Sequence, residues 1–330
     1  MPSSYKPIFE KLEAQKVIKL IKDKFEKLLS EKLNLVRVSA PIIVPSDTGV
    51  NDLLNGYERP VEFDVKETKR KLQIVQSLAK WKRIALKKYG FDINEGLYTD
   101  MNAIRRDEDT DNIHSIYVDQ WDWERIISKE ERNVDYLKKI VKDLFEVFKM
   151  TEDVLIENYP DKKLNKTLPN DIFFITSQEL EDMYPDKMPA EREQLIGKEK
   201  KAVFIIGIGD KLKSGVVHDK RSPDYDDWKL DGDLLIYDKA IDKTIEISSM
   251  GIRVDETSLK EQLEKAKCMD RLEYPYHQKI LKKELPYTIG GGIGQSRILM
   301  LILEKEHIAE VQASSWEEKT ELELKDMKIL

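Results

Sequence analysis

The sequence predicts a single α/β domain, in the broad sense that includes α+β, with a largely antiparallel sheet flanked by helices. Three observations predict this class. Helical and strand-like patterns alternate along the chain, two strand-like segments are joined by a short polar connection, and no internal repeat or Pro/Ser-rich linker divides residues 1–330. We therefore expect one domain over residues 1–330.

The first third of the chain begins with a long helical pattern. In residues 14–33 apolar side chains recur at helical spacing, and Lys and Glu fill the opposite face, which predicts an amphipathic helix. β-branched residues replace this pattern over 34–41 and predict a strand that ends at Pro41. Beyond it, the patterns predict a polar loop, a short strand and a helix at 44–56, 72–75 and 77–88.

The remaining chain contains the strands expected at the centre of the sheet. Residues 115–127 are rich in strong β-formers, and 202–208 are almost entirely apolar, which predicts a strand covered on both faces. Residues 234–237 and 244–248 flank a short polar connection and predict a hairpin. Helices are expected at 134–148, 259–268 and 297–304, the last after a glycine-rich turn.

The charge balance excludes one class of partner. Against 63 Asp and Glu residues stand 56 Lys and Arg residues, so the net charge of the 330-residue chain is −7. Such a chain lacks the overall positive field of a protein whose main partner is nucleic acid or an anionic membrane, although local basic clusters could still bind phosphate. A hydrophobic fraction of 40% is enough for a real core.

Targeting and thiol-metal signals are not found in the sequence. Residues 1–16 contain no apolar stretch like the core of a secretory signal, and the longest apolar run, 298–303, is too short to span a bilayer. We therefore expect a cytoplasmic protein with no membrane partner. The single cysteine, Cys268, cannot form an intrachain disulfide, and the four histidines lack zinc-hydrolase spacing.

The densest glycine signal is the segment TIGGGIGQSR at 288–297. Its glycines, which include Gly292 and Gly294, allow close backbone approach, and the following helix offers free N–H groups to an anion. A dinucleotide fold would need this loop early in a βαβ unit, and a Walker loop would need Gly-Lys-Ser/Thr. Neither condition holds, and taken alone the segment is equally well explained as a structural turn.

Three features together resemble the catalytic domain of class II aminoacyl-tRNA synthetases. Gly292, Gly294 and Arg297 match the third signature of that family, Gly-x-Gly-x-x-Arg. The first signature, a long helix leading to a strand that ends in proline, matches residues 14–41. The second signature contains a phosphate-binding arginine between two strands, a role that Arg105 fits, with Arg106 as the alternative.

Alternation along residues 115–124 places Gln120, Asp122 and Glu124 on one side of the expected strand. An unpaired buried charge is costly, so a central strand must satisfy these groups. The functional interpretation is a face that lines a substrate site, with Gln120 and Asp122 reaching an amino group. The alternative is an edge strand wetted by solvent.

The hairpin adds a second pair of carboxylates. If its centre lies between residues 240 and 241, Asp233 pairs across with Ser248, and Leu235 with Glu246. Asp233 and Glu246 then share a face as diagonal neighbours, which suits Mg²⁺ bound beside phosphates. A one-residue slip in register would separate the two carboxylates.

A closer resemblance extends over nearly the whole chain. Several segments are similar to the ammonia-dependent aspartate–ammonia ligase family, also called asparagine synthetase type A: 76–83, 96–99, 114–125, 224–228, 244–255 and 288–297. The resemblance implies a homodimer with the class II synthetase fold. It also implies an enzyme that uses ATP and Mg²⁺ to form β-aspartyl-AMP and diphosphate, and then admits ammonia to release asparagine and AMP.

The resemblance also implies the site residues. Arg105, Arg297, Asp52 and Lys82 are the expected catalytic residues. The residues expected to bind ATP or its metal are Arg105, Asp233, Glu246, Ser248, Ser249, Gly292, Gly294 and Arg297, with Asp233 and Glu246 as the metal pair. Those expected to bind aspartate or ammonia are Asp52, Ser77, Lys82, Gln120, Asp122, Asp226 and Arg253.

Without this resemblance, Lys82 would be interpreted as a solvated helix lysine and Arg253 as part of a salt bridge at a strand end. Two departures from the bacterial relatives are visible: Gln76 stands where a histidine is expected, and the link from Trp228 to Asp233 is short.

The sequence disfavours three alternative functions. A tRNA synthetase would need an anticodon-binding domain, but the helix at 14–33 begins almost at the N-terminus with no basic module before it. A non-catalytic regulatory relative would have no reason to keep both arginines and the carboxylates. A glutamine-dependent synthetase would need a nucleophilic cysteine, commonly at residue 2, which is Pro2 here. The expected partners are L-aspartate, ATP and free ammonia, without tRNA.

Overall fold

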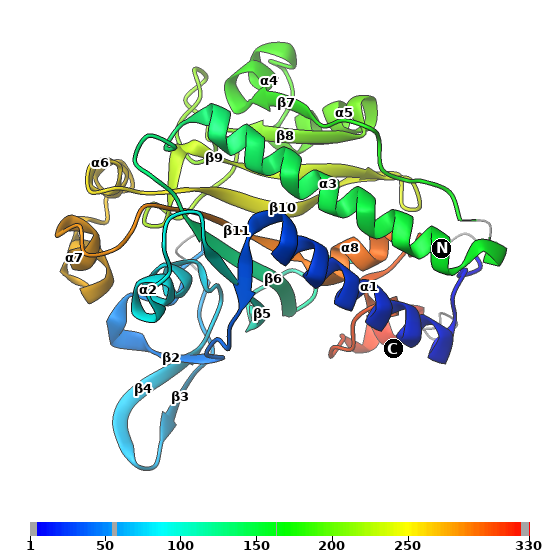
Figure 1. Ribbon diagram of the computed structural model, residues 1–330, viewed down its shortest axis with the longest axis horizontal. Coiled ribbons are helices and arrows are strands. Elements are labelled where there is room, and N and C mark those ends of the chain that lie inside the picture. Colours follow the sequence, from blue (N-terminus) through cyan, green and yellow to red (C-terminus); the bar gives the residue numbers. More distant parts are fainter. Residues whose placement is uncertain (1–4, 55–57, 163, 325–329) are drawn as a thin grey trace.

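The computed structural model describes residues 5–54, 58–162, 164–324 and 330. A mixed eight-stranded sheet forms the centre of the molecule (Figure 1). Its strands are, in spatial order, β1 (Leu35–Arg37), β5 (Gly96–Ile104), β6 (Tyr117–Ile126), β11 (Thr288–Gly294), β10 (Lys243–Arg253), β9 (Asp226–Asp238), β8 (Ala202–Ile206) and β7 (Phe173–Thr176). Only the outer pairs β1–β5 and β7–β8 are parallel, so the predicted largely antiparallel sheet is confirmed.

A smaller sheet of three antiparallel strands projects from this body (Figure 1). Its strands are, in spatial order, β2 (Ile43–Pro45), β4 (Thr68–Ile74) and β3 (Glu62–Val65). A short 3₁₀ turn, η1 (Ser46–Thr48), follows β2 and leads to Asp52. The loop that carries Asp52 to the site therefore starts at strand β2 of this smaller sheet.

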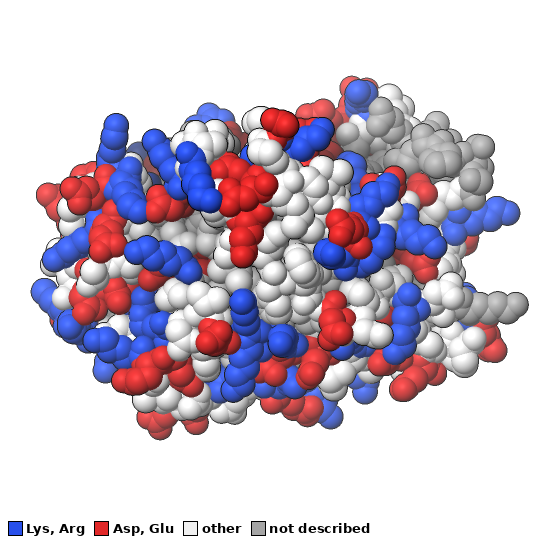
Figure 2. Space-filling model, turned by 90° about the horizontal axis from the view of Figure 1, so that it is seen from above, with Lys and Arg blue, Asp and Glu red and all other residues white. Residues whose placement is uncertain are grey.

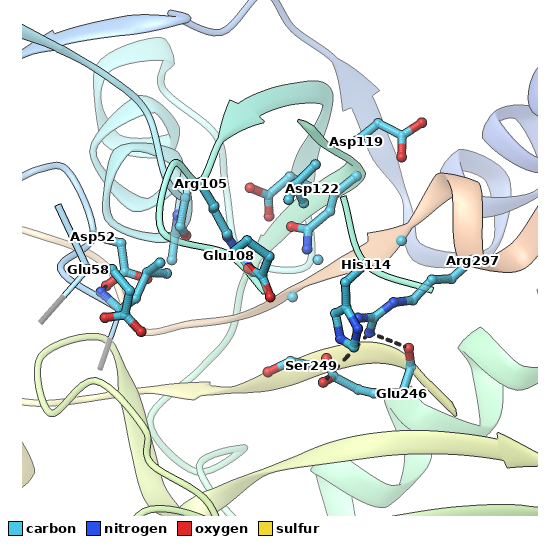
Figure 3. A pocket seen from close by; sticks show the side chains of 18 of the residues that line it. Asp52, Glu58, Arg105, Glu108, His114, Asp119, Asp122, Glu246, Ser249 and Arg297 are labelled. Atoms are coloured by element: carbon cyan, nitrogen blue, oxygen red, sulfur yellow. Dashed lines mark hydrogen bonds and ion pairs between the residues drawn. The ribbon is translucent and has the colours of Figure 1, made fainter. Parts of the chain in front are cut away.

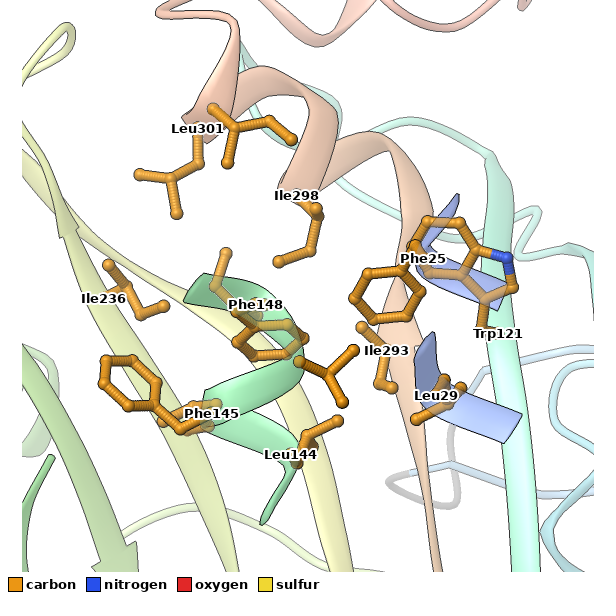
Figure 4. Close-up of a cluster of buried hydrophobic side chains, with 14 of the residues drawn as sticks. Phe25, Leu29, Trp121, Leu144, Phe145, Phe148, Ile236, Ile293, Ile298 and Leu301 are labelled. Carbon is orange, nitrogen blue, oxygen red and sulfur yellow. The ribbon is translucent and has the colours of Figure 1, made fainter. Parts of the chain in front are cut away.

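Two long helices cover one face of the large sheet. In Figure 1, α1 (Lys11–Leu33) and α3 (Val134–Asn158) run diagonally across the strands. The rings of Phe25 and Trp121 stack 4.0 Å apart, and Phe148 stacks on Phe25 at 5.7 Å (Figure 4). Because Trp121 faces these helices, its neighbours Gln120 and Asp122 point to the opposite face. The core thus decides which side of β6 can carry the site.

Shorter helices surround the rest of the sheet. They are α2 (Ala79–Tyr89), α4 (Ser177–Met183), α5 (Pro189–Lys200), α6 (Ser258–Lys265), α7 (Pro275–Leu281), α8 (Gln295–Ile302) and α9 (Glu318–Glu323), with 3₁₀ turns η2 (Pro160–Lys162), η3 (Met269–Glu273) and η4 (Ile308–Glu310). None of the helices within the described residues is long and apolar enough to cross a membrane. On the face seen in Figure 2, positive and negative side chains are interspersed.

The expected glycine-rich turn is wrong. Residues 288–294 form β11, a strand between β6 and β10, and none of the four glycines at 290, 291, 292 and 294 has a positive φ. The glycines are needed for space instead. A Cβ at Gly290 would lie 2.6 Å from the backbone oxygen of Trp123, and one at Gly291 would lie 2.5 Å from Cβ of Met250. At Gly290 and Gly291 the neighbouring strands therefore approach too closely for a side chain.

The predicted hairpin is present and longer than expected, because β9 and β10 extend its ladder to Arg253 and Asp226. Leu235 pairs with Glu246 as predicted. A register shift between Glu246 and Ser248 then places Asp233 opposite Ser249, which corrects the expected pairing with Ser248. Such an irregularity inserts a residue on one strand and depends on its surroundings rather than on alternation.

Other boundaries differ in length. The helix expected over 134–148 continues to Asn158, and the strand expected over 34–41 spans only Leu35–Arg37. The C-terminal part of α3 remains buried through Leu155, so tertiary packing prolongs the helix beyond its strongest apolar pattern.

Candidate active site

A cavity of about 400 Å³ opens on the sheet face opposite α1 and α3. Most of the expected site residues line it: Asp52, Ser77, Lys82, Arg105, Gln120, Asp122, Asp226, Glu246, Ser249, Arg253, Gly292, Gly294 and Arg297. In Figure 3, side chains from loops, β6, β10 and α8 converge on this space. Residues almost 250 positions apart in the chain thus meet in one cavity of the size typical for small-molecule sites.

Asp233, Ser248 and Arg106 do not line the cavity. Arg106 is exposed, whereas Arg105 lies at the cavity, so of the two arginines only Arg105 is placed to meet a ligand there. The hydroxyl of Ser248 is buried and has no hydrogen-bond partner among the described residues.

Lys82 belongs to a buried group of charges at one end of the cavity. The Nζ of Lys82 donates to the Asp122 carboxylate, to the Trp123 carbonyl at 2.8 Å and to the Gly291 carbonyl at 3.1 Å. Burial lowers the pKa of Lys82 and raises that of Asp122, while their mutual attraction opposes both shifts. One oxygen of Asp122, Oδ2, is buried without a partner among the described residues.

Arg253 completes this group from the end of β10. Its guanidinium donates to Glu124 at 2.7 and 3.0 Å and forms an ion pair with Asp226. Thr288 also donates to Glu124, at 2.7 Å. Burial alone would raise the pKa of Glu124, but Arg253 and Lys82 outweigh it and hold that pKa below its usual value. Arg253, Glu124 and Thr288 are thus linked by protein hydrogen bonds, which rigidifies the floor of the cavity.

Asp52 lies on the loop that follows η1 and is 2% exposed. Its Oδ1 accepts a hydrogen bond from the Leu54 amide at 3.0 Å, while Oδ2 is buried without a partner among the described residues. Burial raises the pKa of Asp52, and the positive charge of Lys80 opposes that rise. The Oδ2 oxygen of Asp52 can therefore still accept a hydrogen bond within a confined space.

Two arginines that line the cavity remain accessible. Arg105 follows β5 and its side chain is 26% exposed, with the Glu108 carboxylate 4.0 Å away. Arg297 lies in the first turn of α8 and donates to the Glu246 carbonyl at 2.8 Å (Figure 3). Its distance to the Glu246 carboxylate is 3.9 Å. Both guanidinium groups can therefore turn towards an anion without leaving a buried carboxylate unpaired.

Sequence reasoning missed Arg221, which also lines the cavity. Its guanidinium donates to Asp233 at 2.6 Å and to Ser249, and lies 3.4 Å from Asp231. Arg221 occupies the loop between β8 and β9 and belongs to none of the signatures. The available signal was its position three residues before the DYDDW segment at 224–228, which the resemblance did cover.

The carboxylates at the cavity are too few to coordinate a cation without ligands from a substrate or water. Within the described part of the chain, no group of three or more His, Cys, Asp or Glu residues is arranged to hold a metal ion. Asp233 is already paired with Arg221, whereas Glu246 has a side chain that is 43% exposed. This donor set fits Mg²⁺, which commonly takes one or two carboxylates and fills its other positions with phosphate oxygens and water.

The chain is similar to aspartate–ammonia ligases over almost its entire length. The family model for aspartate-ammonia ligase matches residues 12–328. The aspartate–ammonia ligase of Clostridium perfringens strain 13 is 61% identical over 319 residues, covering 96% of this chain and 94% of that protein. The one from Ruminiclostridium cellulolyticum is 60% identical, with the same coverage of both chains.

Solved structures with the same fold are tRNA synthetases of class II. Asparaginyl-tRNA synthetase of Pyrococcus horikoshii, complexed with asparaginyl-adenylate, superposes with a TM-score of 0.64 at 15% identity, covering 91% of this chain and 68% of that chain. Aspartyl-tRNA synthetase of Entamoeba histolytica gives 0.62 at 15% identity, covering 91% and 57%. At such identities the likeness shows the fold alone, while the family model and the relatives at 60% identity show the family. This chain therefore belongs to the aspartate–ammonia ligase family of enzymes and has the class II aminoacyl-tRNA synthetase fold.

Proposed function

We propose that this chain joins L-aspartate and free ammonia into L-asparagine, by way of β-aspartyl-AMP, and releases AMP and diphosphate. One observation carries the proposal. A single cavity is lined both by a buried, ion-paired group of charges and by two accessible arginines. The first suits an amino acid, and the second suits the phosphates that activate it.

The net negative charge of the buried group fits an amino acid substrate. Lys82 and Arg253 contribute two positive charges, and Asp122, Glu124 and Asp226 contribute three negative ones, so the group carries −1 when all are ionised. The ammonium group of aspartate would neutralise it, with the unpartnered Oδ2 of Asp122 as an available acceptor. Lys82 and Arg253 would in turn face the carboxylates of the substrate.

Activation needs the arginines because a carboxylate is a poor electrophile. The β-carboxylate attacks the α-phosphorus of ATP, the bond to the diphosphate breaks, and the acyl group gains AMP as a leaving group. Arg105 would stabilise the negative charge that develops on the α-phosphate, and Arg297 would hold the distal phosphates or stack on adenine. The two side chains stay 26% and 21% exposed, which leaves them free to bind.

Asp52 is the group that we assign to the second step. Ammonia attacks the acyl carbon, the bond to the AMP oxygen breaks, and one proton must leave the nitrogen. A buried carboxylate with a raised pKa and an oxygen without a described partner is suited to bind ammonia on entry, by accepting a hydrogen bond from it, and then to accept that proton. AMP departs as the anion, so the step requires no further reactant.

We also propose Mg²⁺ as the cofactor, held by Glu246 together with ATP oxygens. Asp233 stands behind Arg221, with which it forms an ion pair. When bound, the ion would neutralise phosphate charge and orient the diphosphate as a leaving group. The homodimer and the cytoplasmic location implied by the family resemblance complete the proposal. Sedimentation of the purified protein at two concentrations tests the dimer.

A coupled assay of AMP and asparagine tests the reaction. Aspartate, ATP and Mg²⁺ are supplied with ammonium, glutamine or tRNA as the only acceptor. We expect equal amounts of AMP and asparagine with ammonium, and neither product with the other acceptors. Formation of aspartyl- or asparaginyl-tRNA, or turnover that ignores ammonium, would refute the proposal. Chelation with EDTA should stop the reaction, and added Mg²⁺ should restore it.

A further inference from the structure

Lys80 is a buried lysine that the proposed chemistry does not use. It lies on α2, two residues before Lys82, and is 2% exposed. Its Nζ donates to the carbonyls of Gly49 and Asn51 at 3.2 and 3.3 Å. Asn51 immediately precedes Asp52, so Lys80 holds the backbone of the loop that carries Asp52.

The third partner of Lys80 is Asp224, at 2.9 Å. Asp224 is completely buried and lies two residues before Asp226. Its Oδ2 also lies 2.9 Å from Nε2 of His277 on α7, and its Oδ1 accepts from Ser222 at 2.9 Å. Burial alone would raise the pKa of Asp224, but Lys80 and His277 outweigh it and keep that pKa well below its usual value.

Lys80 and Asp224 therefore join two loops that lie far apart in the sequence. One loop ends in Asp52, the carboxylate assigned to ammonia, and the other leads to Asp226 in the aspartate end of the cavity. Neither Lys80 nor Asp224 lines the cavity. An ion pair buried at 2% and 1% side-chain exposure is strongly disfavoured to break, because, among the described residues, Lys80 would keep only two backbone carbonyls as partners, and Asp224 would lose the closest lysine and keep only Ser222, His277 and Arg271.

We propose that Lys80 and Asp224 are positioning residues, which set the separation between Asp52 and the aspartate end of the cavity and thereby the geometry of ammonia attack. This inference rests on the proposed function. A misplacement of about 1 Å in such a site can cost roughly 100-fold in rate. Loss of the Lys80–Asp224 ion pair should therefore slow the ammonia step and leave nucleotide binding intact.

The charge of Lys80 also acts on Asp52 directly. The charged or titratable groups around Asp52 are Lys80 on α2, Asp224 and Tyr225 on the loop before β9, and Arg105 after β5. Lys80 and Arg105 lower the pKa of Asp52, and Asp224 raises it. Removing Lys80 should raise this pKa further, so the acidic limb of the activity profile should move to higher pH.

The experiment compares Lys80→Met with Lys305→Met in the full-length protein. Lys305 is a matched control, because it is also 1% exposed and pairs with a buried carboxylate, Glu310, at 3.2 Å. Lys80→Met should lower kcat/KM for ammonium by about 100-fold and leave the KM for ATP within about twofold. Lys305→Met should lower the melting temperature without moving either parameter or the pH profile.

A double variant separates positioning from stability. In Lys80→Met/Asp224→Asn the buried carboxylate that has lost its lysine is also removed, so part of the lost melting temperature should return, while the loss for ammonium and the shifted acidic limb should persist. This variant also serves if Lys80→Met alone does not fold. Recovery of the kinetics together with the melting temperature, or equal losses for ATP and ammonium, would overturn the inference. Failure of the proposed function looks different, since the unmodified protein would then form no asparagine.

Discussion

The guanidinium of Arg221, on the loop between β8 and β9, donates to the carboxylate of Asp233 on β9 at 2.6 Å. Asp231 stands 3.4 Å away on the other side of the same guanidinium, and all three side chains are at most 9% exposed. Burial raises the pKa of Asp233, and Arg221 opposes this. One protein cation thus serves two buried carboxylates, and Asp233 is not free to hold a metal ion unless Arg221 moves.

Replacing Arg221 should destabilise the fold strongly. Arg221→Met leaves Asp231 and Asp233 buried without their cation, and breaking a buried pair in this way costs about 3–5 kcal/mol. Urea denaturation measures the loss, and Arg221→Met/Asp233→Asn should recover part of it. The control is Arg37→Met, whose exposed pair with Asp100 should be worth at most ~1 kcal/mol. Equal small effects in both variants would show that the Arg221 cluster is not a stabilising unit.

Arg297 should matter for adenylate formation and not for folding. In Arg297→Ala the aspartate-dependent exchange of diphosphate into ATP should fall by at least ~100-fold, since a charge-stabilising donor is lost. Among the described residues, the partners that Arg297 leaves behind are on Glu246, whose side chain is 43% exposed, so the melting temperature should stay unchanged. Exposed Arg106→Ala is the control and should exchange normally. Normal exchange in Arg297→Ala would remove Arg297 from the site.

Asp52 should show opposite effects on activity and stability. Asp52→Asn should impair the use of aspartate and ammonia more than ATP binding, because the acceptor of the second step is lost. Its pKa is raised in the fold by burial, so the folded state binds more protons than the unfolded state, and stability falls as pH rises from the usual Asp pKa towards the raised value. Asp52→Asn should therefore melt higher than the parent protein at neutral pH, with the difference vanishing in acid.

The control for this pH dependence is Asp47, five residues earlier. Arg70 lowers the pKa of Asp47, so its contribution to stability has the opposite sign and is lost as pH falls. Asp47→Asn should give no gain in melting temperature at neutral pH. A gain in both variants, or in neither, would contradict the assignment of a buried, destabilising charge to Asp52.

The glycines of β11 should differ in their tolerance of a methyl group. A Cβ at Gly290 would lie 2.6 Å from the Trp123 carbonyl oxygen and would also meet the Glu124 carboxylate, so Gly290→Ala should prevent folding or lower the melting temperature sharply. At Gly294 the nearest atom is Cβ of Arg297 at 3.4 Å. Gly294→Ala should fold normally. Comparable melting temperatures for the two variants would mean that the strands separate easily.

Local patterns were sufficient for the elements whose partners lie close in the sequence or whose periodicity is strong. The helical spacing of 14–33 corresponds to α1, and the alternation along 115–124 correctly placed Gln120 and Asp122 together on one face of the strand. The central position of β6 was also predicted correctly, and the edge-strand alternative is wrong. These features depend on backbone geometry and on the transfer of apolar side chains from water, which a sequence expresses directly.

Other features required contacts between distant segments. The glycines of β11 suit a turn or a strand equally well in isolation, and only the strands on both sides exclude a Cβ. The shift between Glu246 and Ser248 moved Asp233 opposite Ser249, which alternation cannot foresee. A bulge depends on the fit of the whole sheet, whereas alternation counts residues along one strand.

The sequence by itself therefore determined the fold class, the polar face of β6 and, through its resemblance, the family. Only the tertiary structure decided that Arg221 forms an ion pair with Asp233 and that Lys80 links the Asp52 loop to Asp224. It also decided that Arg105 rather than Arg106 lines the cavity. The physical reason is that a buried charge is stable only beside its counter-charge, and here the two partners are up to 144 residues apart in the chain.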